Sequence, residues 1–182
     1  MPALSSHKWT KRRIRLQRVL VSSFGGFVTI GAISYLSRLS GYSFLIPSFG
    51  ASCFIAFVIP DSAFAHPKNI IGGHILSAVI GLVCLTAFGS TWWGSAIAVS
   101  IAIGAMQLAR VLHPPAAADP LLIMAQAGVS WTFLLSPVLS GSILLVAIAS
   151  VYNYFRIKRH QETNHFYDYF GLTPKPEKSK HA

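Results

Sequence analysis

Apolar residues in this chain occur in long uninterrupted runs, with few polar residues between them. Four of these runs approach the roughly 20 residues that a helix needs to cross the hydrocarbon of a bilayer. They cover about Val19–Ser37, Ile70–Phe88, Trp92–Leu112 and Thr132–Tyr154. Tryptophan and tyrosine residues lie near several run ends, where their amphipathic rings favour the membrane interface. The pattern predicts an all-α integral membrane protein with four long transmembrane helices.

Two shorter apolar segments complete the pattern, at Pro47–Ile59 and Pro115–Ala127. Each opens with proline, which suits the first turn of a helix. Each is thirteen residues long, which corresponds to roughly 20 Å of helix and is short of a full crossing. We expect either re-entrant half-helices or short spans that irregular backbone completes.

The two halves of the apolar body, residues 19–88 and 89–155, are candidate internal repeats. The order of elements is the same in both: a long helix, a proline-led short helix and a long helix. An ungapped shift of 68 residues matches Gly26 with Gly94, Pro47 with Pro115, and Gly73 with Gly141. If the short segments span the membrane, the chain crosses it six times in inverted repeats. If they are re-entrant, it crosses four times in parallel repeats.

Charge is scarce and concentrated at the two ends of the chain. Only 11% of residues are charged, yet the net charge is +10, whereas a soluble domain has about 25% charged residues. The basic N-terminal segment 1–18 and the polar tail 156–182 flank the transmembrane domain 19–155. The positive-inside rule predicts that both termini are cytoplasmic, where their basic residues would meet anionic lipid headgroups. A nucleic-acid partner is not expected, because the basic residues do not line one face.

The segment His113–Pro120, which reads HPPAAADP, interrupts the apolar sequence. Proline removes a backbone donor and an aspartate resists leaving water, so this segment is costly at membrane depth. Non-helical backbone survives there only where protein buries it or a wet cavity solvates it. The segment Ile46–Ser52 is a similar break at the matching place in the first half. Such paired breaks indicate the binding site of a transporter.

Both breaks are predicted to present a helix N-terminus, whose free N–H groups and dipole favour an anion. Ser48 and Ser52 add hydroxyl donors, and the alanines from Ala116 onward would let a small ion approach the backbone. The candidate substrate-binding residues are Pro47, Ser48, Gly50, Ser52, Lys68, His74, Arg110, His113, Pro114, Pro115, Ala116 and Asp119.

Four of these candidates are basic, and each has an alternative role. Lys68 and Arg110 would attract an anion, or they would snorkel to the interface from helix ends. With these two residues inside and only Arg38 outside, charge counting favours six crossings. His74 is a candidate ligand or a hydrogen-bonded packing residue. His113 precedes the two prolines and would titrate near neutral pH, which would couple transport to protons.

The sequence gives little support to catalysis or to a metal centre. No glutamate precedes Glu162, and no Ser-His-acid pattern, metalloprotease motif or phosphate-binding loop is present. The histidines 66, 74 and 113 do not follow a known ligand spacing. We therefore expect no enzyme activity, no cofactor and no bound metal, and we keep a histidine-based metalloprotein as a minor alternative.

Several short motifs in order resemble the HPP family of integral membrane proteins. They are Gly50-Ala51-Ser52, Pro60-Asp61-Ser62, Pro67-Lys68-Asn69, Gly72-Gly73-His74 and His113-Pro114-Pro115. The resemblance covers roughly residues 15–155 and departs from the family pattern at Ala117, where glycine is frequent. It implies a helical inner-membrane protein with four spanning helices. Family members in cyanobacteria and chloroplasts are implicated in nitrite transport. Some bacterial members carry regulatory CBS domains, for which this chain is too short.

Together, the sequence features and the resemblance predict a transporter or channel for a small inorganic anion, with nitrite as the specific prediction. We expect it in the bacterial inner (plasma) membrane as a homo-oligomer, because so small a body leaves little room for a sealed pathway. The alternative from another class is a membrane scaffold or assembly module without a substrate, whose helices pack through glycine faces.

Overall fold

The computed structural model describes residues 3–126 and 128–159, which contain helices and loops and no strand. The elements in order are α1 (Ala3–Ser40), α2 (Ser48–Val58), η1 (Ala63–Ala65), α3 (Pro67–Phe88), α4 (Trp92–Leu108), η2 (Pro114–Ala118), α5 (Asp119–Ala125), η3 (Leu134–Leu139) and α6 (Ser140–Arg159). The prediction of an all-helical protein is confirmed. The C-terminal tail from residue 160 onward lies outside the described residues.

Within the described residues, three helical stretches are long and apolar enough to cross a membrane. They are Leu16–Ser40 in α1, Pro67–Phe88 in α3, and Leu134–Phe155 across η3 and α6. The prediction of four long helices is not confirmed, because the predicted run Trp92–Leu112 forms the shorter helix α4, which ends at Leu108. Arg110 has a φ of 56°, a left-handed conformation that does not continue an α-helix. The N–H of Val111 then donates to the carbonyl of Met106 at 3.0 Å.

The two proline-led segments form short helices of different construction. The first is α2, which begins directly after Pro47 and ends one residue before the predicted end. The second is divided into the 3-10 helix η2 and the α-helix α5. Pro114 and Pro115 carry no N–H, so the first turn begins with the amide of Ala116, which donates to the carbonyl three residues earlier at 3.0 Å.

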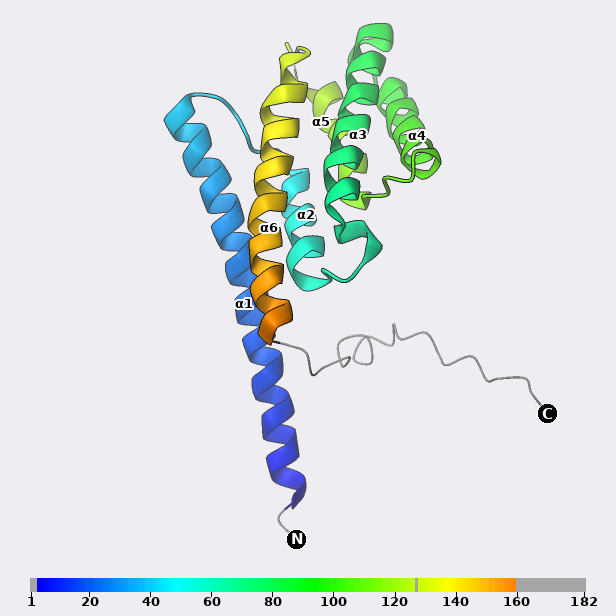
Figure 1. The fold of residues 1–182 in the computed structure, drawn as a ribbon. Helices are drawn as coiled ribbons and strands as arrows, with labels where there is room; N and C mark the ends of the chain where they lie inside the picture. Colours follow the sequence, from blue (N-terminus) through cyan, green and yellow to red (C-terminus); the bar gives the residue numbers. More distant parts are fainter. Residues whose placement is uncertain (1–2, 127, 160–182) are drawn as a thin grey trace, which may run out of the picture.

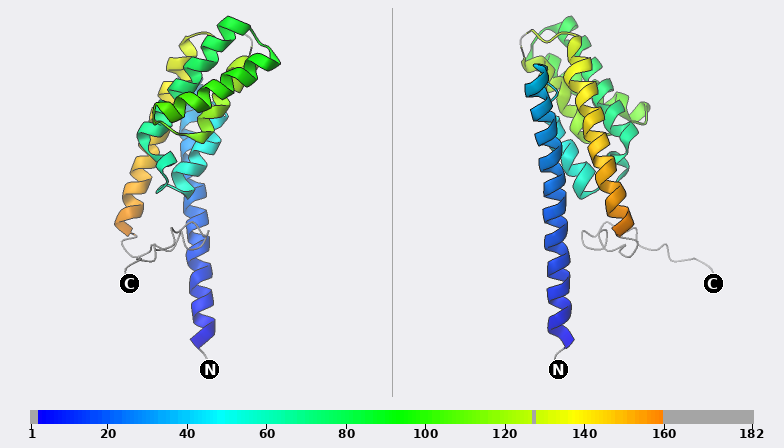
Figure 2. Two further views of the ribbon diagram at one scale, coloured as in Figure 1. Left: turned by 90° about the vertical axis from the view of Figure 1, so that its right-hand side faces the viewer. Right: turned by 60° about the vertical axis from the view of Figure 1, so that its left-hand side comes forward.

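Each short helix carries the chain onward to the opposite end of the body (Figure 1). The chain rises through α1, enters the body before α2, and descends through that helix. It then rises through α3, descends through α4, rises through η2 and α5, and descends through α6 (Figures 1 and 2). The first residues of α1 and the last of α6 therefore lie at the same end. The direction of the chain thus alternates from one helix to the next in the described part, and the number of membrane crossings stays a prediction.

Small residues on α3 bring that helix close to the segment 111–123. An added Cβ at Gly73 would lie 2.7 Å from Cβ of His113, and one at Gly81 would lie 3.0 Å from Cα of Pro120. Real Cβ atoms essentially never come as close as the approach at Gly73, and the approach at Gly81 is tighter than nine in ten real Cβ contacts. The backbone before and within η2 is thereby held against α3.

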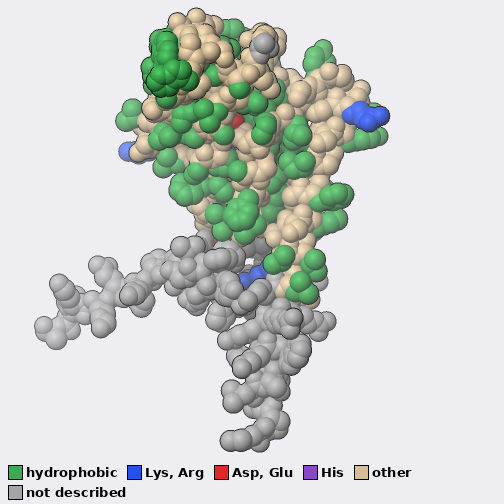
Figure 3. Space-filling view, turned by 180° about the vertical axis from the view of Figure 1, so that it is seen from behind, with side chains coloured by type: hydrophobic (Ala, Val, Ile, Leu, Met, Phe, Trp, Pro, Cys, Tyr) green, Lys and Arg blue, Asp and Glu red, His purple; other side chains and the backbone are tan. Residues whose placement is uncertain are grey.

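Large apolar side chains cover the outside of the helical body (Figure 3). Phe24, Phe27, Trp92 and Leu108 are between 64% and 89% exposed. In water so much exposed apolar surface would be unfavourable, whereas hydrocarbon solvates it without cost. The surface is that of a protein embedded in lipid.

Candidate functional site

Five polar side chains meet in the interior of the body, and we refer to them as the central cluster. Ser48 and Ser52 come from α2, His74 comes from α3, His113 precedes η2, and Asp119 is the first residue of α5. Ser48 is 7% exposed and the other four are fully buried. The structure thus places residues of both proline-led breaks side by side.

The carboxylate of Asp119 joins α2 to α3. The hydroxyl of Ser48 donates to Oδ1 of Asp119 at 2.6 Å. Nδ1 of His74 lies 2.7 Å from Oδ2 of the same carboxylate. Because a carboxylate only accepts hydrogen bonds, Nδ1 of His74 carries the hydrogen. Both oxygens of the buried acid are therefore bonded, as a charge removed from water requires.

The hydroxyl of Ser52 joins the two imidazole rings. Its Oγ lies 2.9 Å from Nε2 of His74 and 2.8 Å from Nε2 of His113. The second nitrogen of the His113 ring, Nδ1, donates to the carbonyl oxygen of Phe64 in η1 at 2.9 Å. A continuous line of hydrogen bonds therefore runs from Ser48 through the central cluster to the η1 loop.

Local geometry explains why these side chains converge. Ser48 and Ser52 are four residues apart on α2, so they lie on the same face of the helix. On α3, Gly73 leaves room for His113 while the next residue, His74, points into the cluster. One turn further along α3, the hydroxyl of Ser77 donates to the carbonyl of Ala116 at 2.6 Å and anchors η2.

The backbone at the two breaks differs from the expected open anion site. The amides of Phe49 and Gly50 donate to carbonyls three residues earlier, at 3.0 and 3.1 Å, and the amide of Ala116 does the same at 3.0 Å. Ala116 is fully buried, so it does not line an open approach. The expectation that backbone N–H groups form the site is therefore corrected: in this conformation side chains supply the polar contacts.

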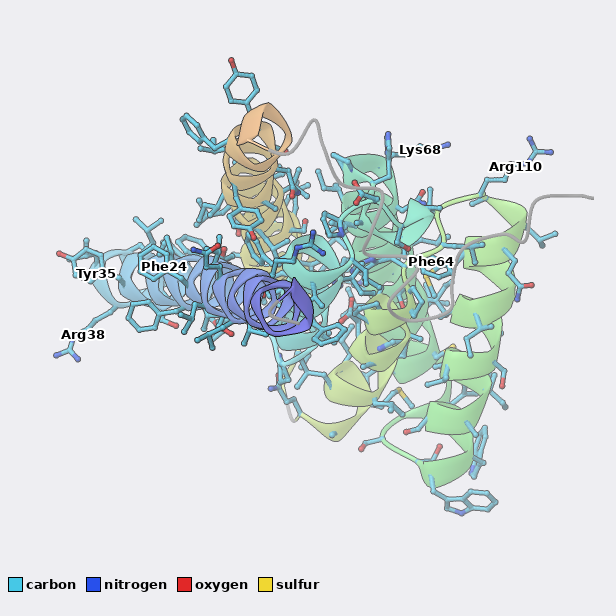
Figure 4. The ribbon with its side chains drawn as sticks, turned by 90° about the horizontal axis from the view of Figure 1, so that it is seen from below. Phe24, Tyr35, Arg38, Phe64, Lys68 and Arg110 are labelled. Atoms are coloured by element: carbon cyan, nitrogen blue, oxygen red, sulfur yellow. The ribbon has the colours of Figure 1, made fainter. Side chains whose placement is uncertain are left out.

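Lys68 and Arg110 lie outside the central cluster. Both residues are exposed, at the start of α3 and just after α4. Viewed from below, their side chains project outward at the edge of the body, whereas Phe64 lies further in (Figure 4). Their position at helix ends matches the snorkelling alternative, and their attraction for an anion stays a prediction. Of the remaining candidates, Pro115 is buried, whereas Pro47, Gly50 and Pro114 are exposed.

A metal centre has no counterpart among the described residues. No group of three or more His, Cys, Asp or Glu side chains there is arranged to hold a metal ion. His74 and His113 are separated by the hydroxyl of Ser52, and the remaining nitrogen of each ring is bonded to Asp119 or to Phe64.

Two contributors to the site were missed at the level of sequence. Phe64 participates through its backbone carbonyl, which has no signature in the amino-acid sequence. Ser77 lies in an apolar helix where a serine is unremarkable, although its spacing of three residues from His74 places it on the same helical face.

The helical body, its apolar surface and its buried ionisable cluster define an integral membrane protein. The chain belongs to the HPP family, because the family model described as HPP, transmembrane region, matches residues 11–162. The resemblance noted from its short motifs is thereby confirmed.

Two curated relatives are transmembrane proteins of Dictyostelium discoideum. The first is 37% identical over 147 residues, which cover 76% of this chain and 52% of the relative. The second is 33% identical over 147 residues, which cover 76% of this chain and 47% of the relative. The chain thus spans about half the length of the curated relatives it matches. No solved structure matches it.

Proposed function

We propose that this protein transports a small inorganic anion across the membrane, with nitrite as the first substrate to test. The observation that supports this proposal is the central cluster: two histidines, an aspartate and two serines buried where both short helices begin. Ionisable residues are expensive inside a membrane protein and mark substrate pathways there. The paired helix breaks are the usual setting of a transporter site.

The cluster has the donors that a small oxyanion needs. The hydroxyls of Ser48 and Ser52, Nδ1 of His74 and Nε2 of both rings meet in one small volume, whereas Nδ1 of His113 faces the carbonyl of Phe64. The negative charge of the Asp119 carboxylate would repel an anion, and protonation of the histidines would offset that charge. A monovalent anion would bind when the rings carry enough protons to leave the cluster positive.

Lys68 and Arg110 would act at the mouth of the pathway. Both lie on the side of η1, which the hydrogen-bond line from His113 reaches. Exposed cations at an entrance raise the local anion concentration and the association rate. By the positive-inside rule we place this end of the body, with the basic N-terminal segment, in the cytoplasm.

The direct test is uptake of nitrite into vesicles reconstituted with the purified full chain. We expect uptake above that of empty vesicles, and we expect Ser52→Ala to lower the rate at least about tenfold, as is usual when a key hydrogen-bond donor is removed. The matched control is Ser100→Ala, the same change at an exposed serine on α4. No uptake by the parent protein, with no binding of nitrite, nitrate, formate or chloride, would refute the proposal.

The closed packing of the cluster favours a second candidate function, a membrane scaffold without a substrate. The five side chains are at most 7% exposed and are bonded mainly to one another. Such a network would serve to hold α2 and α5 in place. In that case Ser52→Ala and Asp119→Asn would lower the stability of the protein, and no vesicle experiment with the parent protein would show an anion flux.

A further inference from the structure

The hydrogen bonds at Ser52 constrain the number of protons in the central cluster. Nδ1 of His74 carries a hydrogen because it faces a carboxylate, and Nδ1 of His113 carries one because it faces a carbonyl. If both rings were neutral, both Nε2 atoms would be bare acceptors. Ser52 has one hydroxyl hydrogen, so it would satisfy only one of them.

One additional proton satisfies every partner. With a proton on Nε2 of one ring, that ring donates to Oγ of Ser52, which in turn donates to Nε2 of the other ring. The carbonyl of Ser48 is the third neighbour of Oγ, at 3.2 Å, which is longer than the contacts of 2.9 and 2.8 Å to the rings. The hydroxyl hydrogen therefore belongs to the imidazole bonds, and with Asp119 ionised the cluster holds one imidazolium beside one carboxylate.

We propose that His74, Ser52 and His113 form a proton-binding and proton-transfer site. In the transfer step the Nε2–H bond of the His74 imidazolium breaks and its proton forms a new O–H bond at Ser52. The original hydroxyl proton of Ser52 simultaneously forms an N–H bond at Nε2 of His113. The positive charge moves from one ring to the other, and Ser52 ends as a neutral hydroxyl.

The surroundings of the two rings give this transfer a direction. Asp119 on α5 faces His74 and stabilises the charge there. The ring of His113 faces the ring of His74 on α3, and the two ring centroids are 5.0 Å apart. Its other neighbours are uncharged: the hydroxyl of Ser52 on α2 and the carbonyl of Phe64 in η1. The basic groups His66, Lys68 and Arg110, at the start of α3 and just after α4, are exposed. A proton on His113 is therefore less stabilised and adjoins the η1 loop, whose Phe64 is 38% exposed.

This site would couple protons to the anion, an extension that rests on the proposed function. With Asp119 ionised and one ring protonated, the cluster is neutral. A bound monovalent anion would make it negative, which is unfavourable in a medium of low dielectric. Uptake of a second proton, which charges His74 and His113 together, restores neutrality. We expect one proton to accompany each anion.

The proton count can be measured without any transport. The probe is the full chain in lipid nanodiscs, labelled with ¹⁵N in the histidine rings, with His74→Gln and His113→Gln used to assign the signals. At neutral pH we expect three N–H groups and one bare Nε2 in this pair of rings, with exchange between the two Nε2 sites. Two bare Nε2 atoms, or none, would overturn the proposal, as would exchange that persists in Ser52→Ala. Ser52→Thr, which retains the hydroxyl, should retain the exchange.

The coupling is tested in vesicles that contain a pH-sensitive dye, with nitrite outside. We expect acidification of the interior together with nitrite entry in the parent protein and in Ser100→Ala. Ser52→Ala should lose the acidification. Nitrite entry at the same rate with and without a pH gradient would overturn the coupling while leaving anion transport intact. Absence of nitrite entry, together with the expected proton count by NMR, would refute the proposed function while leaving the proton site intact.

Discussion

Replacement of Asp119 by asparagine should strongly destabilise the protein. The carboxylate is fully buried and accepts hydrogen bonds from Ser48 at 2.6 Å and from His74 at 2.7 Å. Asparagine has nearly the same shape but only one acceptor oxygen, so it cannot accept from both partners. It also leaves the charge on His74 without its counter-ion.

The size of the effect follows from these contacts. Removal of one partner of a buried ion pair costs about 3–5 kcal/mol, because the other charge stays buried without compensation. If His74 loses its proton instead, the cost falls to that of an unsatisfied buried polar group, about 1–3 kcal/mol. We therefore expect Asp119→Asn to lower the free energy of unfolding by about 3 kcal/mol, at the boundary of the two ranges.

The measurement is reversible unfolding of the purified protein in mixed micelles of increasing denaturing detergent, followed by tryptophan fluorescence. Asp61→Asn is the matched control, because it makes the same change at an exposed aspartate. There we expect a change below about 1 kcal/mol, as for surface charges in general. The reasoning would be refuted if Asp119→Asn and Asp61→Asn unfolded at the same detergent fraction.

Two further predictions concern the packing at α3 and the outer cations. Gly73→Ala should destabilise the protein by about 1–3 kcal/mol in the same assay, since its Cβ would lie 2.7 Å from Cβ of His113. Gly50→Ala, which meets nothing within 4 Å, should instead be neutral or stabilising by up to about 1 kcal/mol; equal effects of the two would contradict the packing. Lys68→Gln combined with Arg110→Gln should slow nitrite uptake at low ionic strength and much less in high salt, where charges are screened. A deficit independent of salt would show that the two residues act otherwise.

Much of the helical framework follows from local features of the sequence. Long apolar runs locate α1, α3 and α6, because the length of a hydrophobic run and the thickness of the bilayer are directly related. Proline also locates the start of α2, since its missing N–H and fixed φ suit a first turn. The end of α4 does not follow in this way. The apolar run continues to Leu112, and only the left-handed backbone at Arg110 stops the helix earlier.

The residues of the central cluster were all identifiable as candidates, because polar groups are rare and costly in an apolar sequence. Their arrangement was not. Ser52 lies 22 residues from His74 and 61 residues from His113, so its place between the rings depends on how three elements pack. The outward position of Lys68 and Arg110 is likewise a result of packing, because a basic residue at a helix end can point either way.

The sequence by itself determined that this is a helical membrane protein of the HPP family with two proline-led breaks. Hydropathy, proline and short motifs depend only on residues that are neighbours in the sequence, so they can be identified without a structure. Only the tertiary structure decided that the breaks meet through side chains, with Ser52 between two imidazoles and Asp119 against one of them. The reason is that one hydroxyl hydrogen and two ring nitrogens impose a proton count only once they lie within hydrogen-bond distance, and that distance is set by the packing of α2, α3 and η2.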